Sequence, residues 1–299
     1  MLVIILISFN SSFSQVKWQN ADAQFQPLPA SVHVYFTDDK IDTGAFRAYY
    51  VIANLKDKHL NFTTDTTYKR RLTPNQFYQK NNKPLVVVNG TFFSFETNQN
   101  LNVVVKDGKL LGYNVRKIKS KKDTTLFTDE PMIRGVIGID KKRHADIAWI
   151  KSDSNNKYPV AYQIFPTADS SIPSKKWKMK TAIGGGPVLI QAGNIAISNN
   201  QEKMFAGKAI NDKHPRTCIG YTADQKIIIL VIQGRFPGIA TGATLTEEAQ
   251  LMKQLGCVEA VNLDGGGSSC MLINGKPTIE VSDKTGQRPV PAVFIISSQ

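Results

Sequence analysis

Short apolar runs separated by turn residues recur along this chain, and this alternation constrains its fold more than any other feature. Asp107-Gly108 and Asn274-Gly275 each lie between two apolar segments that would form the strands of a hairpin. Asn-Gly and Asp-Gly favour such turns because both central residues readily take positive φ angles. Further hairpins are expected near Gly193-Asn194, near Ala223-Asp224 and within residues 135–150. Consecutive hairpins predict antiparallel sheets.

Helix signals are few. The segment "TPNQFYQKN" begins with Thr73 as a cap and Pro74 at the first helical position. The segment "TLTEEAQLMKQLG" begins with a capping box of Thr244 and Glu247 and stops at Gly256. Its apolar residues recur at helical spacing and are interpreted as a core face. We therefore predict an α+β fold: mixed, mostly antiparallel β-sheets built from hairpins, with a few helices packed on them.

The N-terminal residues favour export. Residues 1–14 are predicted to be a signal peptide, because an apolar run too short to span a bilayer is followed by small residues. No Lys or Arg precedes the run, and a buried strand is the alternative. Residues 15–299 would form a single domain, in which 15–80 supply N-terminal strands and a helix and 81–299 form a motif-bearing core. We expect an exported protein (periplasmic, cell-surface or secreted) without a membrane span.

The net charge and the cysteine content limit which ligands, partner molecules and metal sites are expected. The formal net charge of +13 favours anionic partners. No nucleic-acid-binding motif accompanies it, so no nucleic-acid partner is expected. The three cysteines allow at most one disulfide and match no metal motif. No cofactor and no metal site is predicted, although a divalent cation beside a phosphate stays an open alternative.

The segment "NLDGGGSS" is the most informative motif. On a strand, Asn262 and Asp264 share one face, so both would look into a cleft. Glycines behind the carboxylate let the backbone approach a ligand, and their N–H groups can form an anion-binding nest. The alternative is a tight turn with a capping Asp. The predicted substrate-binding residues in this motif are Asn262, Gly265, Gly266, Gly267 and Ser268.

A second glycine triplet and the segment "VNGTFF" are further candidates. Gly184, Gly185 and Gly186 either lie beside the first triplet or form a β-bulge or corner. In "VNGTFF", Asn89 ends a strand, and Thr91 and Phe92 follow it. Phe92 would stack on a sugar ring, whereas core packing is the alternative for Phe93.

Two arginines follow a pattern suited to phosphate. Arg216 lies just before one strand and Arg235 just after another, and a guanidinium can give phosphate oxygens two parallel hydrogen bonds. His214 is either a proton donor or a structural histidine. The chain has no P-loop, no Gly-x-Ser-x-Gly elbow and no His-Glu-x-x-His helix.

Six motifs together resemble the phosphodiester glycosidase family: "VNGTFF", "IGGGPVLI", "HPRTCIG", "QGR", "GATLTEEAQLMKQLG" and "NLDGGGSS". The resemblance runs from about Phe46 to the C-terminus. It implies hydrolysis of the bond between a sugar's anomeric carbon and a phosphodiester, with Asn89, Arg216 and Asp264 as catalytic residues. The chain departs from the family in having Gln233 where an Asp is common.

These residues suggest a one-carboxylate mechanism. A phosphate leaves readily as an anion, so no second carboxyl is needed to protonate it. Asp264 would act as nucleophile, base or oxocarbenium stabiliser, Arg216 would bind phosphate, and Asn89 and Asn262 would orient the sugar. The expected partner is a small-molecule or glycan substrate carrying a phosphodiester, with no obligate protein partner. The alternatives are a non-catalytic exported module that binds anionic glycans or cell-wall polymers, and a phosphodiesterase that cuts P–O.

Overall fold

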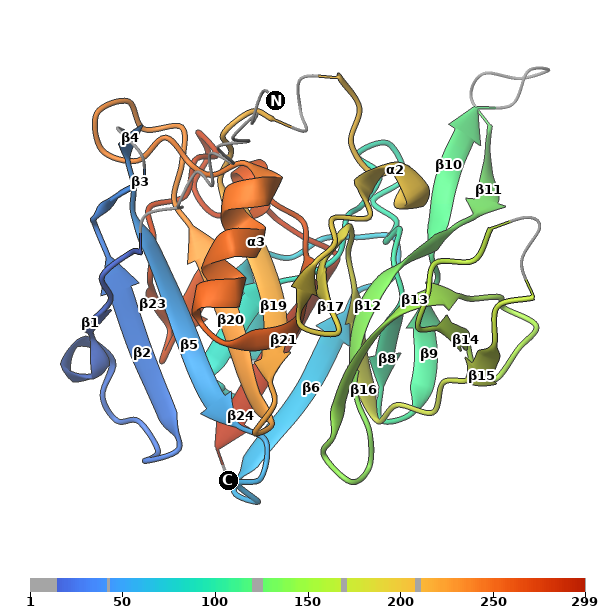
Figure 1. Ribbon diagram of the computed structural model, residues 1–299, viewed down its shortest axis with the longest axis horizontal. Helices are drawn as coiled ribbons and strands as arrows, with labels where there is room; N and C mark the ends of the chain where they lie inside the picture. Colours follow the sequence, from blue (N-terminus) through green and yellow to red (C-terminus); the bar gives the residue numbers. More distant parts are fainter. Residues whose placement is uncertain (1–14, 42–43, 120–125, 168–170, 208–210, 299) are drawn as a thin grey trace, which may run out of the picture.

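Three antiparallel sheets and two short ribbons make up the fold (Figure 1), which the computed structural model describes for residues 15–41, 44–119, 126–167, 171–207 and 211–298. The predicted signal peptide, residues 1–14, lies outside the described residues. Every strand pair registered in the described part is antiparallel, which confirms the predicted class.

The largest sheet has eight strands. In spatial order they are β1 (Gln19–Asn20), β2 (Val32–Thr37), β5 (Ala48–Asn54), β20 (Lys226–Ile232), β19 (Arg216–Thr222), β21 (Cys257–Asn262), β17 (Val188–Gln191) and β18 (Asn194–Ile195). Two of the predicted hairpins, β17–β18 and β19–β20, are confirmed here.

The second sheet has seven strands. In order they are β15 (Ser174–Lys176), β14 (Val160–Tyr162), β13 (Ala145–Lys151), β12 (Ile133–Ile139), β16 (Thr181–Gly184), β8 (Val104–Lys106) and β9 (Lys109–Gly112). It contains the hairpin expected within residues 135–150 and the one that turns at Asp107-Gly108.

The third sheet has five strands, and in it the C-terminal strand lies between two strands from the first third of the chain. Its strands are β23 (Lys276–Pro277), β22 (Met271–Ile273), β7 (Val86–Asn89), β24 (Ala292–Ser298) and β6 (Leu60–Thr66). The Asn274-Gly275 turn links β22 to β23, as predicted. The two ribbons are β3 (Lys40–Ile41) with β4 (Gly44–Ala45), and β10 (Val115–Lys119) with β11 (Phe127–Pro131). Strands from residues 15–80 pair with strands from 81–299; a single domain with that internal division stays a prediction.

Both predicted helices form. Helix α1 (Pro74–Lys80) and helix α3 (Leu245–Gln254) each begin at a complete capping box, on Thr73 and Thr244. Gly256 has a φ of +84°, the left-handed conformation expected where the chain leaves α3. The sequence did not predict three shorter elements: α2 (Asn199–Glu202) and the 3₁₀ turns η1 (Asp22–Phe25) and η3 (Gly266–Ser268).

The main core lies where the three sheets meet. It is built from β-branched and aliphatic residues on their facing sides, such as Val261 of the first sheet, Ile183 of the second and Val88 of the third. Helix α3 packs on the other face of the eight-stranded sheet, and α1 packs on the five-stranded sheet. This arrangement brings the ends of β7, β19 and β21 together.

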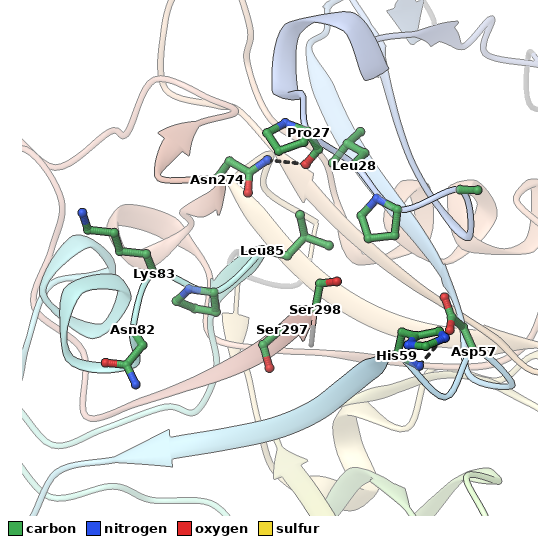
Figure 2. A pocket seen from close by; sticks show the side chains of 13 residues that line it. Pro27, Leu28, Asp57, His59, Asn82, Lys83, Leu85, Asn274, Ser297 and Ser298 are labelled. Carbon is green, nitrogen blue, oxygen red and sulfur yellow. Dashed lines mark hydrogen bonds between the residues drawn. The ribbon is translucent and has the colours of Figure 1, made fainter.

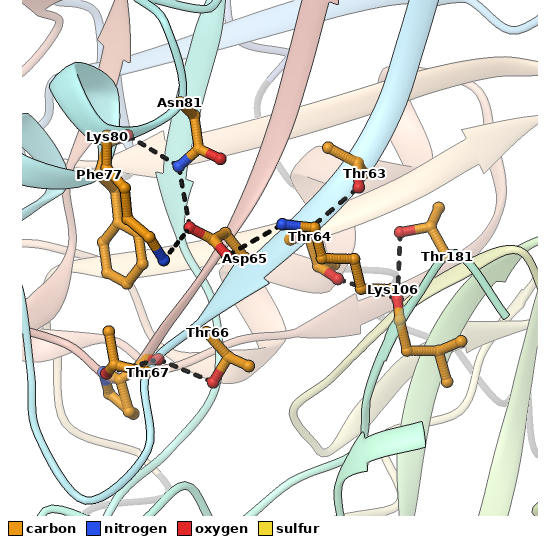
Figure 3. Close-up of polar contacts among 12 residues, drawn as sticks. Thr63, Thr64, Asp65, Thr66, Thr67, Phe77, Lys80, Asn81, Lys106 and Thr181 are labelled. Carbon is orange, nitrogen blue, oxygen red and sulfur yellow. Dashed lines mark hydrogen bonds and ion pairs between the residues drawn. The ribbon is translucent and has the colours of Figure 1, made fainter. Parts of the chain in front are cut away.

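A charge cluster around the buried Asp65 links the third sheet to its neighbours (Figure 3). Asp65 of β6 forms ion pairs with Lys80 of α1 at 2.7 Å and with Lys106 of β8 at 3.1 Å, and Asn81 donates to the same carboxylate at 2.9 Å. These contacts lower the pKa of Asp65 in spite of its burial, because they stabilise the ionised form.

Candidate active site

Three strand ends converge around Asp264. Strand β21 pairs with β19, so its C-terminal end meets the beginning of β19, where Arg216 lies. Beyond the strand, Leu263 N–H donates to Thr217 at 2.7 Å and Gly266 N–H to Pro215 at 2.8 Å. Asp264 N–H instead donates to Gly90, just after β7, at 2.8 Å. Asp264 is therefore fixed between the first and the third sheet.

A cavity of about 220 Å³ lies beside this junction. Most of its walls come from residues that the sequence predicted. The lining residues are Phe92, Phe205, His214, Arg216, Arg235, Asp264, Gly265, Gly266, Gly267 and Arg288. One carboxylate and three guanidiniums thus share one small space, which suits an anionic ligand.

Asp264 has an unusual environment for a carboxylate. Its Oδ2 is buried and has no hydrogen-bond partner among the described residues. Burial raises the pKa of Asp264 to about 7, while the nearby Ser268 hydroxyl, Arg288 and the Gly265 N–H oppose the rise. The Ser268 hydroxyl lies close enough to lower the pKa of Asp264, although it forms no well-aligned hydrogen bond with any described residue. Asp264 can therefore exchange a proton near neutral pH.

Arg216 is buried and held rigidly. Its Nε donates to the carbonyl of Ala243 at 2.9 Å, and one Nη2 hydrogen goes to the carbonyl of Asp212 at 3.2 Å. Its guanidinium lies 5.8 Å from the ring centroid of Phe205. With respect to the described residues, three N–H groups of the fork remain for a ligand. Burial lowers the pKa of Arg216, and buried Glu248 opposes this shift.

The glycines make room for the other two arginines. A Cβ at Gly267 would collide with the guanidinium of Arg288, and one at Gly266 would lie 3.1 Å from that of Arg235. Gly266 also has a φ of +61°, which L side chains rarely adopt. The predicted anion nest is only partly available, because Gly266 N–H donates to Pro215 and Ser268 N–H to Gly265. The glycines thus contribute mainly by admitting guanidiniums.

His214 lines the cavity as a neutral ring at neutral pH. Burial lowers the pKa of its imidazole, and Arg216 and Arg235 lower it further. Its Nδ1 is buried and has no hydrogen-bond partner in the part of the chain that the structure describes. The ring can therefore exchange a hydrogen bond with a ligand.

Unpartnered buried polar atoms gather in the motifs that surround this cavity. Native proteins rarely leave such atoms unsatisfied unless a water or ligand completes them. Those in the site motifs are Thr91 Oγ1, His214 Nδ1, Gln233 Nε2, Asn262 Oδ1, Asp264 Oδ2, Ser268 Oγ and Ser269 Oγ.

Some predicted site residues lie behind the cavity instead of lining it. Asn89 is fully buried; its Nδ2 donates to the backbone carbonyl of Asp264 at 2.5 Å, and its Oδ1 accepts from Thr217 and Cys270. Asn262 donates to the carbonyl of Gly186 at 2.7 Å. These amides hold the backbone around Asp264. Thr91 is also buried and is absent from the cavity wall.

The second glycine triplet packs against protein, not against the cavity. A Cβ at Gly185 would collide with the carbonyl of Asn262, and one at Gly186 with the carboxylate of Glu202. Gly184 N–H donates to Val103. The triplet lies against Asn262 and Leu263 at the end of β21, where it lets two backbones approach each other.

Arg288 and Phe205 were not predicted as site residues. Arg288 follows from no local pattern, although it begins the "RPVPAVFI" part of the C-terminal resemblance. Phe205 packs edge-on against Phe92, with ring centroids 5.9 Å apart. Gln233 is buried outside the cavity wall, and its Oε1 accepts from the N–H of Glu280 at 3.1 Å.

A larger cavity lies elsewhere (Figure 2). It measures about 620 Å³ and is lined by prolines, serines and the residues Asp57, His59 and Lys83. The Asp57 carboxylate already accepts from Ser31 and from the backbone of His59. We favour the smaller cavity because it alone of the two combines an unpartnered buried carboxylate with several guanidiniums. Among the described residues, no cluster of three or more His, Cys, Asp or Glu side chains could hold a metal ion.

The sequence profile described as phosphodiester glycosidase matches residues 82–297, more than half of the chain. This chain belongs to the phosphodiester glycosidase family. The resemblance expected from the motifs is thereby confirmed.

Known members and structural neighbours agree with this assignment. The catalytic domain of zebrafish N-acetylglucosamine-1-phosphodiester alpha-N-acetylglucosaminidase, auto-inhibited by its pro-peptide, superposes with a TM-score of 0.65 at 18% identity. The superposition covers 96% of this family member and 89% of that domain, and it shows a shared fold.

Two curated relatives match over shorter segments. The mouse enzyme of the same name is 33% identical over 95 residues, which is 29% of this chain and 18% of the relative. The SPbeta prophage-derived uncharacterized protein YomE of Bacillus subtilis (strain 168) is 38% identical over 81 residues, which is 27% of this chain and 12% of the relative. The matched segments therefore span less than a fifth of either relative.

No helix in the described part of this phosphodiester glycosidase family member has the length and apolar character needed to cross a membrane. The three cysteines, Cys218, Cys257 and Cys270, are buried and unpaired.

Proposed function

We propose that this protein is a glycosidase that hydrolyses the bond between the anomeric carbon of a sugar and a phosphodiester oxygen. The observation that carries the proposal is the placement of Asp264 in one cavity with Arg216, Arg235 and Arg288. The family membership supports the same reaction class. The names of the mouse and zebrafish relatives suggest N-acetylglucosamine as the sugar to test first.

The arginines would hold the phosphate and the growing charge on it. Arg216 has a fixed orientation with three free N–H groups, and Arg235 lies against Gly266 at the cavity wall. As the bond between carbon and oxygen breaks, its electron pair stays on the phosphate oxygen. Prearranged guanidiniums stabilise that charge without donating a proton.

Asp264 would serve the sugar side of the reaction. In its ionised form it stabilises the positive charge that develops at the anomeric carbon, and it accepts a proton from the attacking water. The water oxygen becomes the new hydroxyl of the sugar, and the products are the free sugar and a phosphate monoester. Asn89 and Asn262 would act as positioning residues, because they bind the backbone beside the carboxylate.

Asp264→Asn tests this role. We expect kcat to fall by about 10³-fold or more, because the amide can neither accept the proton nor balance the charge. The assay measures release of methyl phosphate from N-acetylglucosamine-1-phosphomethyl ester. Asp224→Asn, the same change at the far end of β19, is the matched control and should stay within about twofold, because its surface ion pair contributes little. Activity of Asp264→Asn close to that of the control would refute the assignment.

Hydrolysis in ¹⁸O-labelled water separates the alternatives. Under our proposal the label enters the sugar. A label found in the phosphate would indicate a phosphodiesterase that cuts P–O. A protein that binds the ester in a titration, yet releases no product, would be the non-catalytic glycan-binding module.

A further inference from the structure

An exposed phenylalanine adjoins the candidate site without being part of it. Phe95 is 60% exposed, which is unusual for a large apolar ring. The guanidinium of Arg288, which lines the cavity, lies 5.5 Å from its ring centroid. Phe95 therefore lies next to the cavity and continues its wall outward.

A second arginine lies over the same ring. The guanidinium of Arg71 is 5.2 Å from the centroid of Phe95 and 4.8 Å from that of Phe93. An isolated β-bridge between Leu72 and Val290, with N–H···O distances of 3.0 and 2.8 Å, holds the Arg71 segment beside the Arg288 segment. Arg71, Phe95 and Arg288 thus form a continuous strip that leads away from the cavity.

Within the described part of the chain, the charge of Arg71 has no carboxylate to balance it. Glu96 follows Phe95 in the sequence, but its carboxylate accepts a hydrogen bond from the Ser94 hydroxyl at 2.8 Å and does not pair with Arg71. Arg288 differs, because Asp283 binds its Nε at 2.7 Å. Stacking on two rings orients the Arg71 fork, and none of the hydrogen bonds among the described residues uses its N–H groups.

The strip also leads to open space. Asn100, which bridges to Phe93, lines a second cavity of about 390 Å³ together with Tyr68 and Lys69. A substrate longer than one sugar phosphate could therefore continue past Arg71.

We infer that Arg71 and Phe95 form a subsite for the leaving-group side of the substrate, and that this subsite takes a second phosphate carried by the leaving group. The inference rests on the proposed function, because it assumes that the first phosphate is bound beside Arg288. The ring of Phe95 packs on the carbon chain between the two phosphates, and the Arg71 fork binds the second phosphate.

The test compares substrates that share one sugar. They are the methyl phosphodiester, the 3-phosphopropyl phosphodiester and the uridine diphosphate derivative of N-acetylglucosamine. We expect kcat/KM to be about tenfold higher with a second phosphate, the value of one charge-assisted hydrogen bond. In Arg71→Gln this ratio should fall to about one, whereas Phe95→Ala, which removes only the packing surface, should lower it about threefold. Whichever of the two longer substrates has the higher kcat/KM shows whether the second phosphate belongs to a carbon chain or to a nucleotide.

Arg70→Gln is the matched control. It removes the same charge one residue away, from an exposed side chain that has no ring contact among those described. In Arg70→Gln, the ratio of kcat/KM with and without the second phosphate should equal that of the wild type. A wild type without preference for either longer substrate, or a preference that survives Arg71→Gln, overturns the inference.

Failure of the proposed function would be a separate result. If no substrate is hydrolysed, titration with propane-1,3-diyl bisphosphate and with methyl phosphate tests the subsite alone. Tighter binding of the bisphosphate that Arg71→Gln abolishes supports the subsite. Equal binding of both compounds overturns it.

Discussion

At the scale of residues, Asn89 and Asp264 have different roles in the candidate site: Asn89 binds the backbone, and Asp264 lines the cavity. The Asn89 amide donates to the Asp264 carbonyl and accepts from Thr217 and Cys270, so it joins three segments from behind. The Asp264 side chain is then free to enter the cavity with its Oδ2 unpartnered. Asn89 thus positions the backbone, and the Asp264 carboxylate stays available for the reaction.

The pH dependence of kcat/KM should report Asp264. Its pKa is about 7, and the mechanism needs the ionised form, so kcat/KM should rise about tenfold per pH unit below pH 7 and level off above it. The measurement is a pH–rate profile of the free enzyme with the methyl phosphodiester. A profile that is flat from pH 5 to 8 would contradict the assignment of Asp264.

Glu248→Gln is the control for that profile. Glu248 is fully buried on α3 near Arg216, and burial raises its pKa to about 7 as well. If Asp264 causes the acidic limb, the limb persists in Glu248→Gln. Loss of the limb in that variant would assign it to Glu248.

At the scale of elements, the start of α3 fixes two cavity residues. The Ala243 carbonyl, just before the Thr244 cap, accepts from both Arg216 Nε and the His214 N–H. The capping box itself joins Thr244 Oγ1 to Glu247 N–H at 3.1 Å and Glu247 Oε2 to Thr244 N–H at 2.7 Å. Because the carbonyl that binds Arg216 directly precedes the cap, we expect helix capping and guanidinium placement to be coupled.

Thr244→Ala should show this coupling. We expect it to lower the free energy of unfolding by about 1 kcal/mol, the usual value of a cap, and also to lower kcat/KM. Thr73→Ala on α1 is the control, because it breaks an equivalent capping box away from the cavity. It should cost the same stability without changing kcat/KM. Urea denaturation and steady-state kinetics measure the two effects, and equal kinetics in both variants would disprove the coupling.

At the scale of the whole molecule, the site depends on how the sheets are held together. Asp65 anchors β6 to α1 and to β8 through Lys80 and Lys106 (Figure 3). Strand β6 in turn pairs with β24, which pairs with β7, the strand that ends at Asn89. The charge cluster thus supports the sheet from which Asp264 is held.

Asp65→Asn should destabilise the fold at neutral pH. The folded-state pKa of Asp65 is lowered, so its stabilisation is present above the unfolded pKa, about 3.8, and is lost as the pH falls through the folded value. We expect a loss of about 2 kcal/mol at pH 7, because the buried carboxylate loses its charge-assisted hydrogen bonds to two partly exposed lysines. Denaturation at pH 7 and pH 3 measures this difference, and an equal loss at both values would contradict it.

Much of the local structure could be predicted. The hairpins at Asp107-Gly108 and Asn274-Gly275 and the capping boxes of Thr73 and Thr244 form where the residues indicate. The site could be predicted only in part. Arg216, Arg235 and Asp264 share a cavity as the motifs suggested, but Arg288 and Phe205 carry no local signal.

The sequence by itself determined turns, caps and the glycine-rich segment, because these depend on φ preferences and hydrogen bonds among neighbouring residues. Only the tertiary structure decided that Arg288 faces Asp264 and that Asn89 supports the carboxylate from behind. The Asn89–Asp264 hydrogen bond joins residues 175 positions apart. Such contacts form when sheets pack, and no local preference encodes them.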